Sequence, residues 1–162
     1  MLYSPTARLW KIADFGIAQE GTSRTPLITT SSRGTASYRA PELLINSPIY
    51  TNKVDIWAFG CIAFEVFTGR KRFASDWEVQ NLAQSMPSIS KLIPVEADVE
   101  KSMIKLIEAT LRVDWTARAG LGEILKTMLK MSPLLLKSTR IPKQLKRCER
   151  CFHIWKERVN SP

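Results

Sequence analysis

The stretch DIWAFGCIAFEVFTG, residues 55–69, decides how this chain folds. Its apolar residues fall on nearly every side of a helix, with Asp55 as a candidate N-terminal cap and Gly69 at the end. A helix that is apolar on nearly all sides needs cover all round, because apolar surface is unfavourable in water. The stretch therefore predicts a buried central helix with other elements packed around it.

Three further helices and one hairpin complete the predicted fold. The apolar spacing predicts helices over residues 77–83, 99–111 and 121–129. Ser132-Pro133 is expected to end the last of these helices. Residues 4–8 have the composition of a turn between two short strands. We therefore expect a mainly α fold with a short β-hairpin at the N-terminus.

Composition argues against several classes of protein. The chain has 162 residues, of which 44% are hydrophobic and 24% are charged, as in a globular protein with one core of moderate size. No apolar stretch is long enough to span a membrane, and the N-terminus does not resemble a secretory signal. Three cysteines provide no disulfide framework. We therefore expect an intracellular protein, either cytoplasmic or nuclear.

Three short motifs accompany the central helix. One is Asp14-Phe15-Gly16, the second is GTASYRAPE at residues 34–42, and the third is DWTAR, which ends at Arg118. Together with the helix over 55–69, they have the order and spacing of the eukaryotic protein kinases. Thr35 makes the second motif similar to the serine/threonine kinases. The chain therefore resembles the C-terminal lobe of such a kinase, from the metal-binding loop onward.

The resemblance implies roles for two of these motifs in catalysis. Asp14 is expected to hold magnesium beside ATP, and Phe15 and Gly16 complete this cofactor-binding motif. Thr35 is expected to lie in the substrate-facing loop, where its hydroxyl would help to orient a catalytic aspartate. The implied substrate is a protein hydroxyl group.

The resemblance also implies structural roles. Glu42 and Arg118 are expected to form a buried ion pair, and Asp55 is expected to accept hydrogen bonds from the backbone of a catalytic loop. The implied organisation is a partial kinase domain over residues 1–130 and a separate tail over 131–162. Within the kinase domain, an activation segment covers 14–42 and the helices of the lobe cover 43–130.

Residues 17–41 are polar and rich in hydroxyl groups, so they are predicted to form a mobile loop. In the activation segment of a kinase, a phosphate can order the loop by pairing with arginine. Counting back three residues from Gly34, as in many relatives, indicates Ser31 as a regulatory phosphorylation site, with Thr30 and Ser32 beside it. Alternatively, this segment is a solvated loop that no kinase modifies.

Only thirteen residues precede Asp14, and they contain no Gly-rich loop, strand lysine or catalytic loop. The N-terminal lobe is therefore expected to be absent, and the 162 residues alone are expected to be inactive. Two functions remain open. The chain is either the distal part of a serine/threonine kinase or a non-catalytic, pseudokinase-like scaffold that binds a kinase or a substrate.

The net charge of +9 is concentrated in residues 131–162, which hold eight Lys/Arg and two Glu. Within 141–159, apolar residues recur at alternating steps of four and three, which predicts a basic amphipathic helix. These apolar residues are Ile141, Leu145, Cys148, Phe152, Trp155 and Val159. The helix is expected either to dock on the lobe or to bind a partner groove of the calmodulin type or an anionic membrane.

Two thiols three residues apart, Cys148 and Cys151, suggest a zinc site. A structural zinc site needs four ligands, and His153 is the only histidine of the chain, so we favour a buried or free thiol. No nucleic-acid recognition motif accompanies the basic residues, so specific nucleic-acid binding is not predicted.

Overall fold

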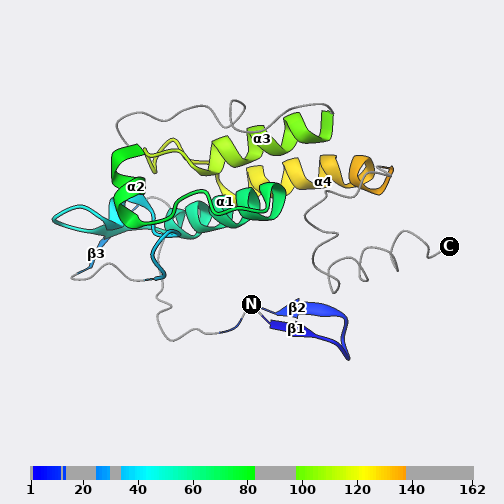
Figure 1. The fold of residues 1–162 in the computed structure, drawn as a ribbon, viewed down its shortest axis with the longest axis horizontal. Helices are drawn as coiled ribbons and strands as arrows, with labels where there is room; N and C mark the ends of the chain where they lie inside the picture. The colour runs from blue at the N-terminus through cyan, green and yellow to red at the C-terminus, as the bar shows by residue number, and fades with distance from the viewer. Residues whose placement is uncertain (1, 12, 14–24, 30–33, 83–97, 138–162) are drawn as a thin grey trace.

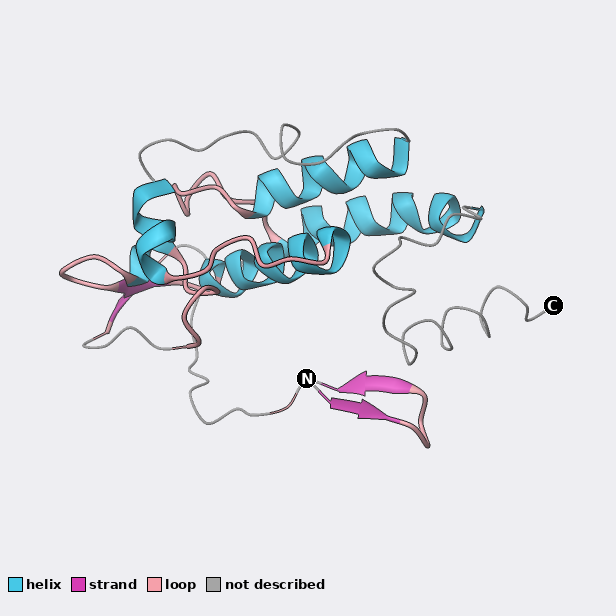
Figure 2. Cartoon of the chain, viewed as in Figure 1, coloured by secondary structure: helices cyan, strands magenta, loops and turns pink. Residues whose placement is uncertain are grey.

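The computed structural model describes residues 2–11, 13, 25–29, 34–82 and 98–137. This part of the chain is mostly helical with a few short strands, as the sequence predicts (Figure 2). In Figure 1, the long helices lie side by side and a shorter helix lies at one end. They are α1 (Lys53–Thr68), α3 (Asp98–Thr110), α4 (Leu121–Lys137) and the short α2 (Asp76–Leu82). No helix of the described residues is long and apolar enough to cross a membrane.

Strands β1 (Leu2–Ser4) and β2 (Leu9–Lys11) form the predicted N-terminal hairpin. The two strands pair antiparallel. In the turn between them, the Ser4 hydroxyl oxygen accepts a hydrogen bond from the backbone N–H of Ala7 at 3.4 Å. The prediction of a hairpin at this place is confirmed.

A second antiparallel pair of strands has no counterpart in the sequence prediction. Strand β3 (Leu27–Ile28) pairs with β4 (Ile49–Tyr50), and Thr29 N–H donates to the carbonyl of Pro48 at 3.0 Å. A strand of two residues is too short to leave an alternating pattern in the sequence. The expectation of a loop throughout this segment is therefore wrong at β3.

Helix α1 forms where the central helix is predicted, but it begins at Lys53 rather than at Asp55. The hydroxyl oxygen of Thr51 accepts a hydrogen bond from Lys53 N–H at 3.1 Å and so satisfies one end of the helix. Asp55 is in the first turn and not at the cap, and its negative charge suits the positive end of the helix dipole. At the other end, Gly69 adopts a φ of 74° and donates its N–H to Glu65 at 2.7 Å.

Helices α1 and α3 approach closely at Gly60. A Cβ atom at this position would collide with the Thr110 hydroxyl and would lie 2.8 Å from Cδ2 of Leu111. The absence of a side chain at Gly60 therefore allows the two helices to pack. The core that they share is built from aromatic, aliphatic and small side chains of both helices and of the segments around them: Ala40, Trp57, Cys61, Phe64, Phe73, Val79, Ile104, Ile107 and Leu111.

One face of α1 is uncovered. Ile62 and Val66, one helical turn apart, are 47% and 55% exposed. Nothing in the part of the chain that the structure describes packs over these side chains. The expectation that this helix is buried on all sides is therefore wrong for the described structure.

Helices α2 and α3 each begin and end one residue before the predicted limits, and α4 begins at Leu121 as predicted. However, α4 continues through Ser132-Pro133 to Lys137, so the predicted break is wrong. A proline inside a helix removes one hydrogen-bond donor and crowds the carbonyl four residues earlier, so packing must offset this cost where the helix continues. Met131, which is 2% exposed and packs with Leu106, Ala119 and Ile124, fixes the helix just before this proline.

Candidate functional site

The structure describes four of the predicted site residues, which are Thr35, Glu42, Asp55 and Arg118. The expected metal and ATP residues, the expected phosphorylation sites and the C-terminal motifs lie outside the described residues: Asp14, Phe15, Gly16, Thr30, Ser31, Ser32, Cys148, Cys151, His153 and the stretch 141–159. Among the described residues, no group of three or more His, Cys, Asp or Glu could hold a metal ion. The candidate site is therefore built on residues 34–42 and their neighbours.

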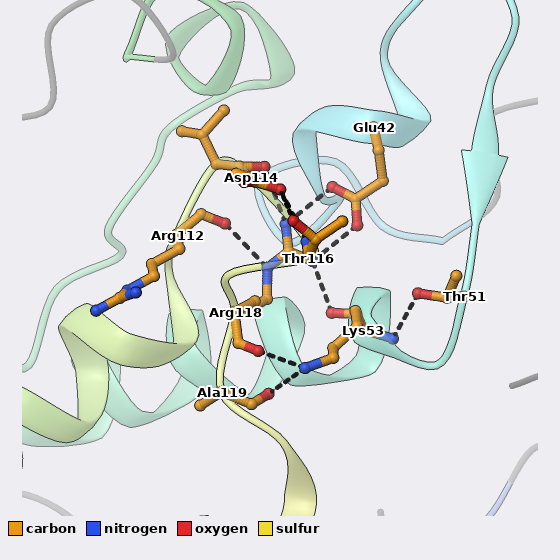
Figure 3. A network of polar contacts seen from close by, with 9 residues as sticks. Glu42, Thr51, Lys53, Arg112, Asp114, Thr116, Arg118 and Ala119 are labelled. Carbon is orange, nitrogen blue, oxygen red and sulfur yellow. Dashed lines mark hydrogen bonds and ion pairs between the residues drawn. The ribbon is translucent and has the colours of Figure 1, made fainter. Parts of the chain in front are cut away.

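Glu42 and Arg118 form a buried ion pair (Figure 3). Glu42 lies in the short 3-10 helix η1 (Pro41–Leu43), and its two carboxylate oxygens accept hydrogen bonds from Arg118 Nη1 and Nη2 at 2.7 and 2.9 Å. The two side chains are 6% and 0% exposed. A guanidinium that meets a carboxylate with two parallel bonds makes one of the strongest side-chain interactions in proteins. The pair therefore fixes η1 to the segment that precedes α4.

Arg118 and Lys53 also hold backbone carbonyl groups at this place (Figure 3). Arg118 donates to the carbonyls of Arg112, Lys53 and Val113 at 3.0, 2.7 and 3.4 Å. The Lys53 ammonium donates in return to the carbonyls of Arg118 and of Ala119, the latter at 3.1 Å. The start of α1, η1 and the segment before α4 are thus one polar network.

The turn that leads to Arg118 is held by Asp114. Its Oδ1 accepts hydrogen bonds from the hydroxyl of Thr116 at 2.7 Å and from the N–H of Thr116 at 2.9 Å. These bonds keep the pKa of Asp114 below its usual range because they stabilise the ionised carboxylate, and the bond from the Thr116 hydroxyl has the larger effect. The two bonds thus hold the turn that leads to Arg118.

A stack of side chains extends from Arg118 into the core. The guanidinium carbon of Arg118 lies 5.1 Å from the ring centre of Trp57, and Trp57 stacks on Phe73 with ring centres 5.5 Å apart. The guanidinium carbon of Arg72 lies 4.8 Å from the ring centre of Phe73. Trp57 Nε1 is buried and has no hydrogen-bond partner among the described residues. The stack links the ion pair to the segment that follows α1.

Asp76, the first residue of α2, fixes the loop before η1. Its Oδ2 accepts a hydrogen bond from Arg39 Nη1 at 2.6 Å, and its Oδ1 accepts one from Ser37 N–H at 3.3 Å. Arg39 Nε also donates to the carbonyl of Gly34 at 2.9 Å. Ser37 is buried with a φ of 73°, and its hydroxyl donates to the carbonyl of Ala74 at 2.9 Å. The loop is therefore bonded both to itself and to α2.

Thr35 lies on the exposed side of this loop. Its carbonyl accepts a hydrogen bond from Tyr38 N–H at 3.2 Å, which closes a turn. The role predicted for its hydroxyl stays a prediction. Thr35 is thus an exposed residue on a loop whose later residues are held by Asp76 and by the Glu42–Arg118 pair.

The phenol of Tyr38 donates a hydrogen bond to Oε2 of Glu65 at 2.5 Å. This bond, together with desolvation and the negative charge of Glu65, raises the pKa of Tyr38 to about 12. The ammonium of Lys71 lies 5.7 Å from the centre of the Tyr38 ring. The loop is thus also tied to α1, which contains Glu65.

Asp55 is exposed in the first turn of α1, and partial desolvation raises the pKa of its carboxyl group. Its predicted role as an acceptor for a catalytic-loop backbone stays a prediction. Within the described structure, Asp55 belongs to neither of the two polar networks that hold residues 34–42.

Sequence reasoning missed Lys53, Arg39 and Asp76. The only local signals are that Asp76 stands just before a predicted helix and that Arg39 lies inside the motif at 34–42. Arg39 and Asp76 are 37 positions apart, and no pattern in a single sequence shows that they meet.

Comparison with known proteins gives a match along most of the chain. A sequence profile described as "Protein kinase domain" matches residues 1–129. Mouse serine/threonine-protein kinase ICK is 47% identical over 74 residues, or 46% of this chain and 11% of that protein. The Arabidopsis thaliana serine/threonine-protein kinase RUNKEL is 33% identical over 118 residues, 68% of this chain and 8% of that protein. Human cyclin-dependent kinase-like 4 is 38% identical over 95 residues, 57% of this chain and 24% of that protein. The chain thus spans between 8% and 24% of the length of these relatives.

Proposed function

Because the chain belongs to the protein kinase family, we propose that it supplies the metal-binding and substrate-facing part of a serine/threonine kinase. In this proposal, residues 1–130 form the C-terminal lobe from the metal-binding loop onward. The reaction is transfer of the γ-phosphoryl group of ATP to a serine or threonine hydroxyl of another protein. Two of the similar proteins, ICK and RUNKEL, carry the name serine/threonine-protein kinase, which supports this choice.

The observation that carries the proposal is the buried pair of Glu42 and Arg118. Phosphoryl transfer depends mainly on positioning, so a loop that presents a substrate must itself have a fixed position. The pair fixes one end of the motif at 34–42, and the bonds that Asp76 accepts from Arg39 and Ser37 fix its middle. Thr35 is the exposed hydroxyl on this loop and is proposed to help to position the reacting groups.

Asp14 is proposed to hold the magnesium ion that accompanies ATP. Its carboxylate has the hard oxygen ligands that magnesium prefers, and the ion would neutralise charge on the phosphates. Phe15 and Gly16 complete this motif. Ser31, with Thr30 and Ser32 beside it, is proposed as a phosphorylation site that regulates the loop.

The test uses the full product of the natural transcript that encodes these residues. Purified protein is incubated with magnesium and labelled ATP, and phosphate on serine and threonine of a mixed protein substrate is counted. We expect transfer that Asp14→Ala abolishes. Lys126→Ala, a change on the exposed face of α4, is the matched control and should leave the transfer unchanged.

Two results would contradict the proposal. The first is transfer that Asp14→Ala does not reduce, because the metal would then be held elsewhere. The second is a folded natural product without transfer, which would favour the non-catalytic scaffold instead. Thermal unfolding of the Asp14→Ala protein shows whether its loss of activity arises from misfolding.

A further inference from the structure

One side of α4 carries a row of apolar side chains that the described part of the chain leaves exposed. Leu121, Leu125 and Met128 are 64%, 51% and 42% exposed. They recur at steps of four and three residues, so they lie on one side of the helix. Ile124 and Met131 lie on a different side, where they pack in a core with α3. The three exposed residues, which we call the α4 stripe, are therefore surface that the contact with α3 leaves open.

The charged side chains of α4 avoid the α4 stripe. At about 100° per residue, Lys126 and Lys130 fall on the opposite side of the helix, and both are exposed. Leu129, which is 72% exposed, extends the apolar surface at the edge of the stripe. An exposed apolar surface with polar side chains around it is typical of an interaction site. The α4 stripe is therefore a candidate docking surface.

The C-terminal tail contains the same pattern in the reverse direction. Read backwards from Val159, its apolar residues recur at steps of four and then three, as those of the α4 stripe do when read forwards from Leu121. Residues of two antiparallel helices meet in reversed order, so a single register pairs every member of the two rows. The pairs are Leu121 with Val159, Leu125 with Trp155, and Met128 with Phe152.

The same register leaves a short connection between the two helices. Helix α4 ends at Lys137 and the apolar pattern of the tail begins at Ile141, so residues 138–140 would form the turn. Antiparallel helices are commonly joined by about two to five residues. Thr139 suits the cap of the second helix, and Pro142 would fall in its first turn, where proline is tolerated. The chain can therefore reverse its direction here without a longer linker.

We propose that residues 141–159 form a helix that folds back antiparallel along α4 and covers the α4 stripe. Phe152 and Trp155 supply most of the apolar surface of this contact, against Met128 and Leu125. The contact does not depend on the proposed phosphoryl transfer, because it involves none of the residues assigned to that reaction.

Two arguments favour the chain's own tail over a partner protein or a membrane as the occupant of the α4 stripe. The short connection keeps the tail beside α4 at an effective concentration in the millimolar range, which a separate molecule seldom reaches. In addition, the basic side chains of the tail fall on the side of its helix away from the apolar row, so docking leaves them in water: Lys143, Lys146, Arg147 and Arg150. A calmodulin-type groove or an anionic membrane would first have to displace the tail from α4.

The test measures two distances in the full chain by pulsed electron paramagnetic resonance between pairs of spin-labelled cysteines. One label replaces Gly122, which is exposed with open space around it, and the second replaces either Gln144 or Asn160. In the antiparallel arrangement, Gln144 lies roughly 20 Å further than Asn160 from Gly122 along the helix axis. We therefore expect Gly122 to be closer to Asn160 than to Gln144. A tail that leads away from α4 gives the opposite order, because Asn160 is further along the chain.

The natural cysteines need not interfere with these labels. Cys148→Ala and Cys151→Ser remove the two thiols of the tail, and the alanine keeps the apolar row intact. Cys61 is buried, and burial raises the pKa of its thiol to about 12, so it should remain unlabelled in the folded chain.

Two variants identify the surfaces in contact. Leu125→Asp and Trp155→Asp each put a charge into the apolar contact, so each should abolish the short distance between the labels at positions 122 and 160. Lys126→Asp is the matched control, because it introduces the same residue on the opposite side of α4 and should preserve the short distance. Thermal unfolding shows that the variants remain folded, and Trp155→Asp alters no residue of the described structure.

Three outcomes would overturn the proposal. The first is a distance to Asn160 that equals or exceeds the distance to Gln144. The second is a short distance that disappears when labelled chains are diluted with unlabelled ones, because the occupant would then be a second copy of the chain. The third is a short distance that persists in both Leu125→Asp and Trp155→Asp, because the tail would then dock elsewhere. Since no ATP is present, each outcome leaves the proposed phosphoryl transfer untouched.

Discussion

Two arginine–carboxylate pairs hold the motif at residues 34–42, and they differ in how deeply they are buried and therefore in how much they should contribute to stability. Arg118 and Glu42 are 0% and 6% exposed, so each charge depends on the other for compensation. Arg39 and Asp76 are 24% and 27% exposed, and water and salt screen their attraction. The energy of an ion pair is thus set by burial more than by distance, since the shortest bonds of the two pairs are 2.7 and 2.6 Å.

We predict that Glu42→Gln lowers the free energy of unfolding by about 3 to 5 kcal/mol, because the charge of Arg118 stays buried without compensation. The matched change Asp76→Asn in the exposed pair should cost about 1 kcal/mol or less. Urea unfolding at neutral pH measures both. Equal losses in the two variants would contradict the distinction.

The raised pKa of Tyr38 predicts that the folded chain loses stability in strong alkali. The hydrogen bond to Glu65 raises the pKa of Tyr38 from its usual 10.0 to about 12 in the folded chain. A raised pKa means that the neutral phenol is favoured by folding, so this contribution is complete below pH 10 and is lost as the pH rises through about 12. Urea unfolding between these pH values should show a smaller decline for Tyr38→Phe than for the unmodified chain. An equal decline in the stability of both proteins would contradict the assignment of this pH dependence to Tyr38.

At the scale of elements, helix packing depends on side chains that are absent as much as on those present. Gly60 lets α1 and α3 approach, whereas Gly122 in the first turn of α4 has no heavy atom within 4 Å of the place where a Cβ would be. Both glycines lie in helices, where glycine is intrinsically unfavourable. The same substitution should therefore have opposite effects at these two positions.

We predict that Gly60→Ala destabilises the chain by about 1 to 3 kcal/mol, because the new methyl group would overlap Thr110 and Leu111. Gly122→Ala should stabilise it by about 0.5 to 1 kcal/mol, since alanine reduces the entropy of the unfolded chain and meets nothing in the fold. Thermal unfolding of the two variants side by side measures the difference. A similar change in both would mean that helix propensity outweighs the close approach.

At the scale of the whole molecule, the sequence predicts what is periodic or belongs to a motif. The helices follow from apolar spacing, and the meeting of Glu42 with Arg118 follows from the family resemblance. The Arg39–Asp76 bond and the pairing of β3 with β4 could not be predicted, because they arise from tertiary placement. The helix through Pro133 shows the opposite case, in which a strong local signal does not end the element.

The separate 162-residue polypeptide is predicted to transfer no phosphate. Its residues include Asp14 and the motif at 34–42, but no Gly-rich loop and no catalytic-loop base. Without these groups, neither the nucleotide nor the acceptor hydroxyl is oriented for reaction. Incubation of the purified polypeptide with magnesium and labelled ATP tests this prediction. Phosphate transfer by the polypeptide that disappears in Asp14→Ala would contradict the prediction and show that these 162 residues are sufficient for catalysis.

The 76 positions between Glu42 and Arg118 also bear on the order of folding events. Joining such distant residues carries an entropic cost that local helix formation avoids, so we expect the pair to form after the rate-limiting barrier. A change at Glu42 would then hasten unfolding in stopped-flow mixing experiments and leave the refolding rate nearly unaltered. In kinetic terms, the pair would determine how long the motif at 34–42 persists once formed, and the helices would determine how quickly the chain reaches it.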